Sequence, residues 1–285
     1  MGARSATRDL SLVSRQRQLL IGLVTLVVVL AGCSSDPPVV RSQGVAPTHT
    51  VEVVQRHPHD PRAFTQGLEL DADSRLYESS GQYGQSALTV GRVGDGAGAG
   101  QEQLRVDFAD VIFAEGLTIV DDEVFVLSWR EQTAFVFDRR TLEPRRQLSY
   151  EGEGWGLCFG GSRLVMSNGS DELTFRDPQT FEATGSVRVA HGEIPVTMLN
   201  ELECDAGTAW ANIWQSDLIV NIDLGSGEVL AVVDAAGLLS EAEAADANVL
   251  NGIARRPDTD TWYLTGKYWP WLFEVSFRPI AAADS

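Results

Sequence analysis

Apolar and polar positions between residues 64 and 275 follow one layout that recurs five times. Each copy opens with a short apolar run that follows an aromatic or small polar residue. The openings lie at residues 64–68, 113–117, 154–157, 199–202 and 250–253. Their last apolar residues are 49, 40, 45 and 51 positions apart. Self-similarity at a period of 20 to 50 residues indicates a repeat architecture.

Two further strand-like runs follow each opening, with turn residues between them. The second runs lie at residues 76–79, 124–127, 164–167, 210–213 and 262–265, and the third at 87–90, 134–137, 173–175, 218–222 and 272–275. Three or four short strands per copy, repeated five times, predict an all-β fold, a five-bladed β-propeller. A parallel α/β fold needs amphipathic helices between strands, and only residues 238–248 look helical.

The strand-like run at residues 51–54 comes before the first copy and has no partner of its own. We expect it to supply the outer strand of the last blade, beside residues 272–275, because an open edge strand invites aggregation. This places the propeller domain at 49–278 and a C-terminal tail at 279–285. Residues 91–100 read as a glycine-rich loop insertion.

The first 32 residues have the features of a targeting segment. Four arginines precede an apolar run at residues 19–30, which is short for a membrane span and suits a signal segment. The sequence LAG before Cys33 resembles a bacterial lipobox, in which the cysteine is diacylated and becomes the new N-terminus. We therefore expect a lipoprotein of the cell envelope, extracytoplasmic and lipid-anchored to a membrane, with a flexible tether at 33–48. The alternative is an ordinary secretory signal.

Charge excludes one class of partner. The net charge of −18 becomes −21 without residues 1–32, which hold four basic and one acidic residue. Nucleic-acid binding needs a basic face, so we expect no nucleic-acid partner. Three cysteines are too few for a disulfide scaffold. Cys158 and Cys204 are either buried thiols or a disulfide.

Polar and aromatic residues at the openings and at the ends of the second strands are candidates for a site. In a propeller these positions meet at one mouth, although they lie far apart in sequence. The candidates are Phe64, Gln66, Glu115, Trp129, Trp155, Asn200, Trp214 and Lys267. The alternative interpretation is that the tryptophans pack between blades and that Glu115 is a surface carboxylate. Polar groups on inner strands must find partners or face a ligand.

Eight stretches in order carry a resemblance to a known family. They are FTQGL at 64–68, ESSGQYGQS at 78–86, FAEGLT at 113–118, EGWGL at 153–157, NELE at 200–203, ANIW at 211–214, VLNGIA at 249–254 and LTGKYWP at 264–270. The chain resembles the plant and bacterial type of glutaminyl-peptide cyclotransferase. The resemblance implies a five-bladed propeller that converts the N-terminal glutamine of peptides or proteins into pyroglutamate and releases ammonia. The family usually has glycine where this chain has Ala114.

The resemblance implies a role for each candidate. Glu115 is expected to move a proton from the attacking amine to the leaving nitrogen. Gln66, an indole N–H of Trp129 or Trp155, and Lys267 are candidates to stabilise the tetrahedral intermediate. Asn200 is expected to hold the first backbone amide of the substrate, and Phe64, Trp155 and Trp214 to wall the pocket. The expected partner is a peptide or protein with N-terminal glutamine, and the expected state is a monomer.

Other groups of residues suggest a metal site or a different function. His57 and His59 beside Pro58 could belong to a metal site, although a turn is the favoured interpretation. We expect no cofactor for catalysis, while a structural ion in the propeller channel stays open. One rival function is a non-catalytic propeller that binds peptides or a partner. Another is a metal-dependent lactonase, whose ligands would come from Glu115, Glu201, Asn200 and Asn251.

Overall fold

The computed structural model describes residues 46–93 and 104–280. These residues form 22 β-strands and one short helix, α1 (Glu241–Ala244). The all-β prediction is therefore confirmed, but helix α1 is much shorter than the helical stretch expected at 238–248. Within the described ranges, no helix has the length and apolar character that a membrane crossing requires.

Most strands belong to four-strand antiparallel groups in chain order. Three groups are separate sheets. The first holds β2 (Thr65–Leu70), β3 (Arg75–Ser80), β4 (Ala87–Arg92) and β5 (Leu104–Asp107). The second holds β6 (Ala114–Val120), β7 (Glu123–Ser128), β8 (Thr133–Asp138) and β9 (Pro144–Ser149). The third holds β10 (Leu157–Phe159), β11 (Leu164–Met166), β12 (Glu172–Arg176) and β13 (Ala183–Arg188).

The remaining large sheet has eight strands, in the order β16-β17-β18-β19-β1-β22-β21-β20. One half holds β16 (Leu199–Asp205), β17 (Thr208–Ile213), β18 (Leu218–Asp223) and β19 (Val229–Asp234). The other holds β20 (Leu250–Arg255), β21 (Trp262–Gly266), β22 (Trp271–Pro279) and β1 (His49–Pro58). Strand pairing between the halves is limited to two parallel residue pairs, between β1 and β19. A small hairpin pairs β14 (Ala190–His191) with β15 (Ile194–Pro195).

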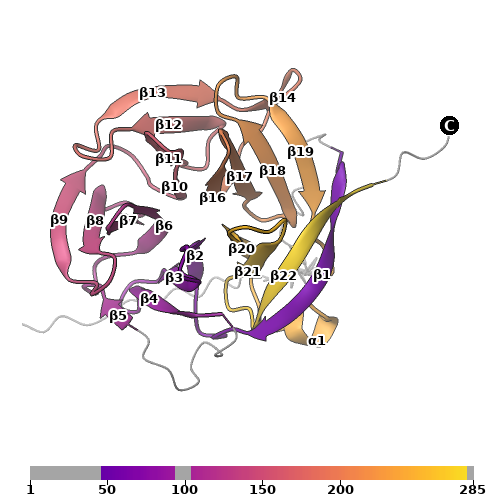
Figure 1. Cartoon of the computed structure of the whole chain (residues 1–285), viewed down its shortest axis with the longest axis horizontal. Helices are drawn as coiled ribbons and strands as arrows, with labels where there is room; N and C mark the ends of the chain where they lie inside the picture. The colour runs from indigo at the N-terminus through magenta and orange to yellow at the C-terminus, as the bar shows by residue number, and fades with distance from the viewer. Residues whose placement is uncertain (1–45, 94–103, 281–285) are drawn as a thin grey trace, which may run out of the picture. The chain divides into compact units, whose positions relative to one another are not determined.

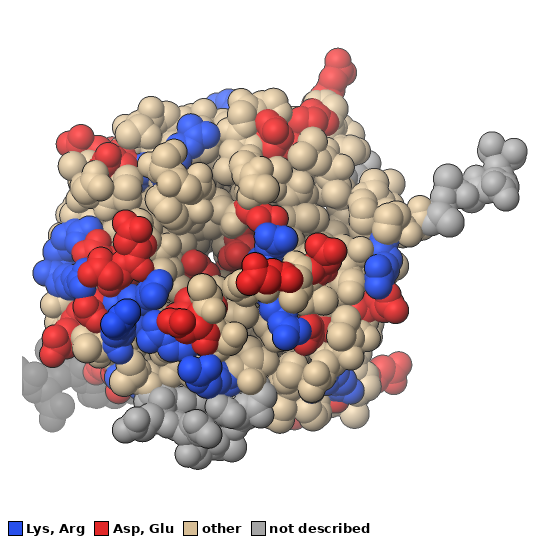
Figure 2. Space-filling view, viewed as in Figure 1, with Lys and Arg blue, Asp and Glu red and all other residues tan. Residues whose placement is uncertain are grey.

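The strand groups are arranged around a common centre (Figure 1). The first strand of each group, namely β2, β6, β10, β16 or β20, lies nearest the middle, and the last lies outside (Figure 1). Figure 2 shows one face, where Asp and Glu side chains gather around a hollow near the middle. Residues that open each sequence repeat are thus brought together at the centre of the molecule.

Strand β1 closes this arrangement. It pairs antiparallel with β22 along its whole length, from His49 opposite Pro279 to Pro58 opposite Trp271. The predicted pairing of residues 51–54 with the last repeat is confirmed. The strands run to Pro279, one residue past the expected end of the domain.

Glycines in the openings allow the inner strands to approach closely. A Cβ on Gly156 would lie 2.0 Å from the carbonyl oxygen of Asn200, and one on Gly116 would lie 2.6 Å from that of Trp155. Real Cβ atoms do not come this near to backbone atoms. The Gly-Leu pairs that mark the repeats are therefore explained by packing at the centre, where no side chain fits between neighbouring strands.

A disulfide joins two neighbouring groups. Cys158 on β10 is bonded to Cys204 on β16, with their Cα atoms 5.4 Å apart. Of the two alternatives left open by the sequence, the structure contains the disulfide. The two cysteines are 46 positions apart in the sequence. Such a cross-link stabilises a fold chiefly by restricting the unfolded chain.

Several predictions fall partly or wholly outside the described residues. These are the signal segment 1–32, the lipidated Cys33, the tether up to residue 45 and the end of the tail at 281–285. The glycine-rich insertion was placed too early in the sequence, because Gly91 and Arg92 belong to strand β4. Its remaining residues from 94 onward lie outside the description.

Candidate active site

Four of the five inner strands carry an irregularity at the same point of their openings. Register shifts occur between Thr65 and Gly67, between Ala114 and Leu117, between Leu199 and Leu202, and between Leu250 and Ile253. A β-bulge leaves residues unpaired in the ladder and re-aims their side chains. The residues released in this way include the predicted Gln66, Glu115 and Asn200.

Three of the openings meet through a chain of side-chain hydrogen bonds. Asn251 donates from Nδ2 to Gln66 Oε1 over 3.2 Å, and Gln66 donates from Nε2 to Glu115 Oε1 over 2.9 Å. Asn251 also donates to the carbonyl oxygen of Thr65 over 2.9 Å. Glu115 is 5% exposed and Gln66 is 3% exposed. The structure therefore brings together Gln66 and Glu115, which the sequence predicted, and adds Asn251.

Lys267 follows strand β21 and is also buried, with 4% exposure. Its Nζ lies 4.7 Å from the centre of the Phe64 ring, within the range of a cation–π contact. Burial lowers the pKa of Lys267 to about 8, although the charge of Glu115 opposes this shift. An ammonium that is so poorly solvated is available to stabilise negative charge nearby.

Burial has the opposite effect on Glu115, because it disfavours the charged form of a carboxyl group. It holds the pKa of Glu115 well above its usual range, and the positive charge of Lys267 opposes the shift. The negative charges of Glu153 and Glu131 raise this pKa further. A carboxyl group whose pKa is raised by burial suits general acid–base work.

Aromatic rings form a connected wall. Phe64 packs edge-on against Phe113, with ring centres 6.0 Å apart, and Phe113 packs in the same way against Trp129 at 5.5 Å. Trp155 packs edge-on against Trp214 at 5.4 Å. The sequence predicted four of these five rings. Phe113 was overlooked, although it opens the FAEGLT stretch.

Glu153 joins the two parts of this wall. Its Oε2 accepts the indole N–H of Trp129 at 2.8 Å and that of Trp155 at 3.1 Å. Both indole donors are therefore occupied by a protein acceptor. This leaves Lys267 and the second amide N–H of Gln66 as the predicted donors for a developing oxyanion, because the first N–H of Gln66 already bonds Glu115. The sequence quoted Glu153 in a motif but gave it no role.

Asn200 lies on strand β16 and is 3% exposed. Its side-chain Oδ1 has no hydrogen-bond partner among the described residues, and the same is true of Asn251 Oδ1. Burying an unpaired acceptor is costly unless a ligand or water satisfies it. Asn200 therefore offers an acceptor of the kind expected for a substrate backbone N–H.

Other buried carboxylates are tied to the fold. Glu201 accepts the backbone N–H of Leu68 at 3.2 Å and that of Ile253 at 2.8 Å. It thereby links its own inner strand to β2 and β20. Across residues 46–93 and 104–280, no group of His, Cys, Asp or Glu side chains is arranged to hold a metal ion. Both oxygens of Glu201 are engaged by backbone donors of neighbouring inner strands.

His59 corrects the expectation that residues 57–60 form a simple turn. His57 and Pro58 end strand β1, and His59 is buried. The ring of His59 bonds the carbonyl oxygen of Trp269 at 2.8 Å and the carboxylate of Glu78 at 3.1 Å. Thr65 donates to the same oxygen of Glu78 at 2.6 Å. This histidine therefore links the last strand group to the first.

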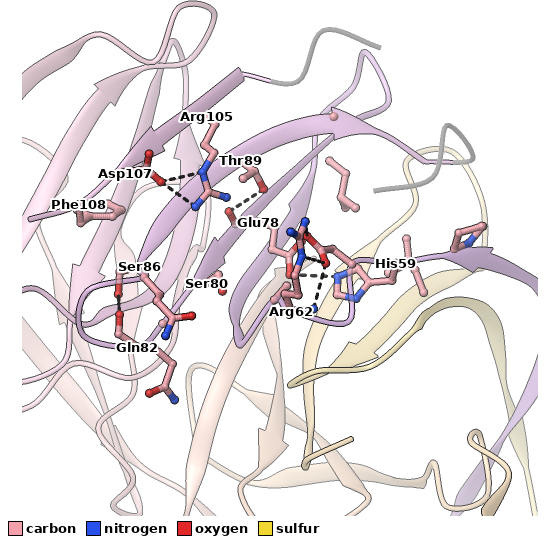
Figure 3. Close-up of a pocket in the computed structure, with 18 of the residues that line it drawn as sticks. His59, Arg62, Glu78, Ser80, Gln82, Ser86, Thr89, Arg105, Asp107 and Phe108 are labelled. Atoms are coloured by element: carbon pink, nitrogen blue, oxygen red, sulfur yellow. Dashed lines mark hydrogen bonds and ion pairs between the residues drawn. The ribbon is translucent and has the colours of Figure 1, made fainter. Parts of the chain in front are cut away.

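A pocket of about 750 Å³ lies next to that link, and none of the predicted site residues lines it. Figure 3 shows His59, Arg62 and Glu78 together on one side of it and Arg105 with Asp107 on another. The ion pairs drawn there are internal to the protein. The candidate site at Glu115 is therefore distinct from this pocket.

Comparisons with known proteins show the family of this chain. The family model described as glutamine cyclotransferase matches residues 24–277. A glutaminyl-peptide cyclotransferase of Arabidopsis thaliana is 36% identical over 237 residues, which cover 81% of this chain and 72% of that protein. The crystal structure of Myxococcus xanthus glutaminyl cyclase matches with a TM-score of 0.72 and 35% identity, covering 82% of this chain and 100% of that one. The chain therefore belongs to the glutamine cyclotransferase family.

Proposed function

We propose that this protein is a glutaminyl-peptide cyclotransferase, an acyltransferase that converts N-terminal glutamine into pyroglutamate and releases ammonia. The names of its relatives support this activity. The observation that carries the proposal is the state of Glu115. This carboxyl group is buried, receives a hydrogen bond from Gln66 and has a raised pKa.

The reaction needs one group that both accepts and donates a proton. The neutral α-amine of the substrate attacks its own side-chain amide carbon, which forms a C–N bond and places negative charge on the amide oxygen. Glu115 takes the proton that the attacking nitrogen loses. It then delivers this proton to the departing nitrogen, the carbonyl re-forms, and the C–N bond to ammonia breaks. Glu115 ends the cycle ionised, as it began.

Two neighbours are placed to assist. Lys267 is buried beside Phe64, and its positive charge would stabilise the oxyanion in surroundings of low polarity. The free acceptor of Asn200 would receive a backbone N–H of the substrate. Phe64, Trp155 and Trp214 would exclude water and fold the glutamine side chain back toward its own amine.

The architecture that supports this site is, in our proposal, a five-bladed propeller. The three separate four-strand sheets would be three blades, and the two halves of the eight-strand sheet would be the other two. The weak parallel joint of two residue pairs between β1 and β19 supports treating the halves as separate blades.

The location proposed from Cys33 is a membrane surface on the extracytoplasmic side. The Cys158–Cys204 disulfide supports this, because disulfides persist in oxidising compartments and are rare in the cytosol. Neither the anchor nor the tether enters the proposed chemistry, so the activity does not depend on them.

The deciding experiment incubates the purified protein with a glutamine-initiated dipeptide and measures released ammonia together with the cyclised product. A dipeptide that begins with asparagine is the matched control, because its shorter side chain would have to close a four-membered ring. Turnover of the glutamine peptide alone, with and without chelator, supports a metal-independent cyclotransferase. Binding without turnover would instead favour a peptide-binding protein.

A further inference from the structure

The aromatic wall of the site has two parts that come from different strand groups. Trp129 follows strand β7, and Trp155 precedes strand β10. The carboxylate of Glu153 bonds both, because its Oε2 accepts the N–H of each indole, at 2.8 Å from Trp129 and 3.1 Å from Trp155. A single oxygen atom thus holds two rings that no shared strand fixes.

The other oxygen of Glu153 is held as well. Its Oε1 accepts the Nε–H of Arg130 at 3.0 Å, and the Arg130 guanidinium lies 3.6 Å from the centre of the Trp129 ring. Burial alone would raise the pKa of Glu153, but hydrogen bonds from Trp155, Trp129 and Arg130 bring it below its usual value. The carboxylate is therefore ionised at neutral pH and keeps its full capacity as an acceptor.

We propose that Glu153 is a positioning residue, which fixes the Trp129 and Trp155 indoles so that the wall is formed before substrate enters. This inference rests on the proposed function. Each ring also has a packing partner on its far side. Trp129 contacts Phe113, and Trp155 contacts Trp214 and covers Gly169, where a Cβ would lie 2.6 Å from the indole. Glu153 is the side chain that bonds both indoles, and the backbone N–H of Gly154 bonds the Trp129 carbonyl oxygen at 3.0 Å.

The rival role for Glu153 is a charge effect, either on Glu115 or on the ammonium form of the substrate. Glu131 provides a matched comparison, because its negative charge also raises the pKa of Glu115. Glu131 accepts hydrogen bonds from the Tyr83 hydroxyl at 3.0 Å and from the Phe113 backbone at 3.3 Å, but none from an indole. If only charge matters, removing the charge of Glu153 or that of Glu131 should change the kinetic constants in the same way.

The test compares Glu153→Ala, Glu153→Gln and Glu131→Gln with the wild-type protein, using a glutamine-initiated dipeptide. In Glu153→Ala both indole bonds are lost, and we expect KM to rise about tenfold or more, with a smaller fall in kcat, because the rings are no longer fixed before substrate binds. The glutamine carbonyl of Glu153→Gln can still accept both indoles, so its KM should stay within about threefold of the wild-type value. Glu131→Gln should also stay within that range.

A second measurement reports directly on the order of the Trp129 and Trp155 rings. The near-ultraviolet circular dichroism of ordered tryptophans should weaken in Glu153→Ala and persist in the two glutamine variants, while thermal unfolding checks that all three fold. Wild-type KM and an unchanged tryptophan signal in Glu153→Ala would overturn the proposal. So would equal, salt-sensitive losses in Glu153→Gln and Glu131→Gln, because these indicate charge alone. If the wild-type protein releases no ammonia, the proposed function fails, and the spectroscopic comparison still decides whether Glu153 orders the rings.

Discussion

Gln66 donates a 2.9 Å hydrogen bond to Glu115 from the neighbouring inner strand, with its amide nitrogen as the donor. Its orientation follows from Asn251, whose amide nitrogen bonds both the oxygen of Gln66 and the carbonyl of Thr65. The order of donors therefore runs from Asn251 through Gln66 to Glu115. A neutral donor at one oxygen fixes the position of the carboxylate and lowers its basicity less than a bonded cation would.

The first prediction concerns Glu115 itself. Glu115→Gln keeps the shape of the side chain but cannot carry a proton, so turnover should fall at least about a hundredfold. Thermal stability should be nearly unchanged, because the substitution removes a carboxyl group that burial disfavours in its charged form. Steady-state kinetics check this, since a purely electrostatic role would raise KM more than it lowers kcat. Wild-type values of both constants would remove Glu115 from the mechanism.

A second prediction follows from the pKa of Lys267, which burial lowers to about 8. If its positive charge stabilises the oxyanion, that contribution is lost as pH rises through about 8. Arginine stays charged, so Lys267→Arg should be slower overall but free of this loss. The ratio of wild-type to variant kcat cancels the titration of the substrate amine, and it should decline across this pH range. A ratio that is constant with pH would argue against a charged Lys267 in the rate-limiting step.

Much of the fold could be predicted because each sequence repeat contains short strand-like runs in the same order. All second and third runs of the five copies appear as strands, from β3 at the first copy to β22 at the last. The outer strands β9 and β13 were not identified individually. Most of their residues are exposed, so the alternation of apolar and polar positions that marks a half-buried strand is absent.

The site was predicted less completely, for a physical reason. A motif shows which residues are present, but hydrogen-bond partners depend on how neighbouring strands approach one another. The link from Glu153 to Trp129 spans 24 residues, and that from Asn251 to Gln66 spans 185. His59 was likewise read as part of a turn, because its partner Glu78 lies in another strand group. The register shifts that redirect Gln66 and Asn251 leave no mark in composition.

A third prediction concerns the link between His59 and Glu78. Burial alone lowers the pKa of His59, but the charge and hydrogen bond of Glu78 and the Trp269 carbonyl outweigh it, so the pKa is raised. A histidine with a raised pKa stabilises the fold fully below its unfolded pKa of about 6.5, and this contribution disappears as pH rises through the folded value. The free energy of unfolding should therefore decrease with rising pH in that window.

The matched variant for this link is His59→Gln, whose amide can still bond Glu78 but does not titrate. It should lower stability by about 1–3 kcal/mol at pH below 6.5, where the His59 ring is protonated in the wild-type protein. Denaturant unfolding at several pH values should show a flatter dependence for the variant over the same window. An identical pH dependence in both proteins would mean that another group is responsible.

A fourth prediction tests the proposed anchor. Cys33→Ser removes the only sulfur that the lipobox-like sequence offers for acylation, so the protein should leave the membrane fraction. Turnover of a glutamine dipeptide should be unchanged, because every residue of the candidate site lies beyond residue 63. Detergent-phase partition of the two proteins provides the measurement. A variant that still enters the detergent phase would contradict lipid anchoring through Cys33.

The last prediction separates a structural carboxylate from a catalytic one. Glu201 and Glu115 occupy neighbouring positions in their openings, are both buried, and both have pKa values that burial raises. Their partners differ, because Glu201 accepts two backbone N–H groups, from Leu68 and Ile253, whereas Glu115 accepts a side-chain amide. Glu201→Ala would leave both backbone donors buried and unpaired, at a cost of about 1–3 kcal/mol each. We therefore expect Glu201→Ala to lower the melting temperature strongly while the folded fraction retains kcat, and Glu115→Ala to do the reverse. Thermal unfolding and kcat corrected for folded protein distinguish them, and a stable but inactive Glu201→Ala would move Glu201 into the site.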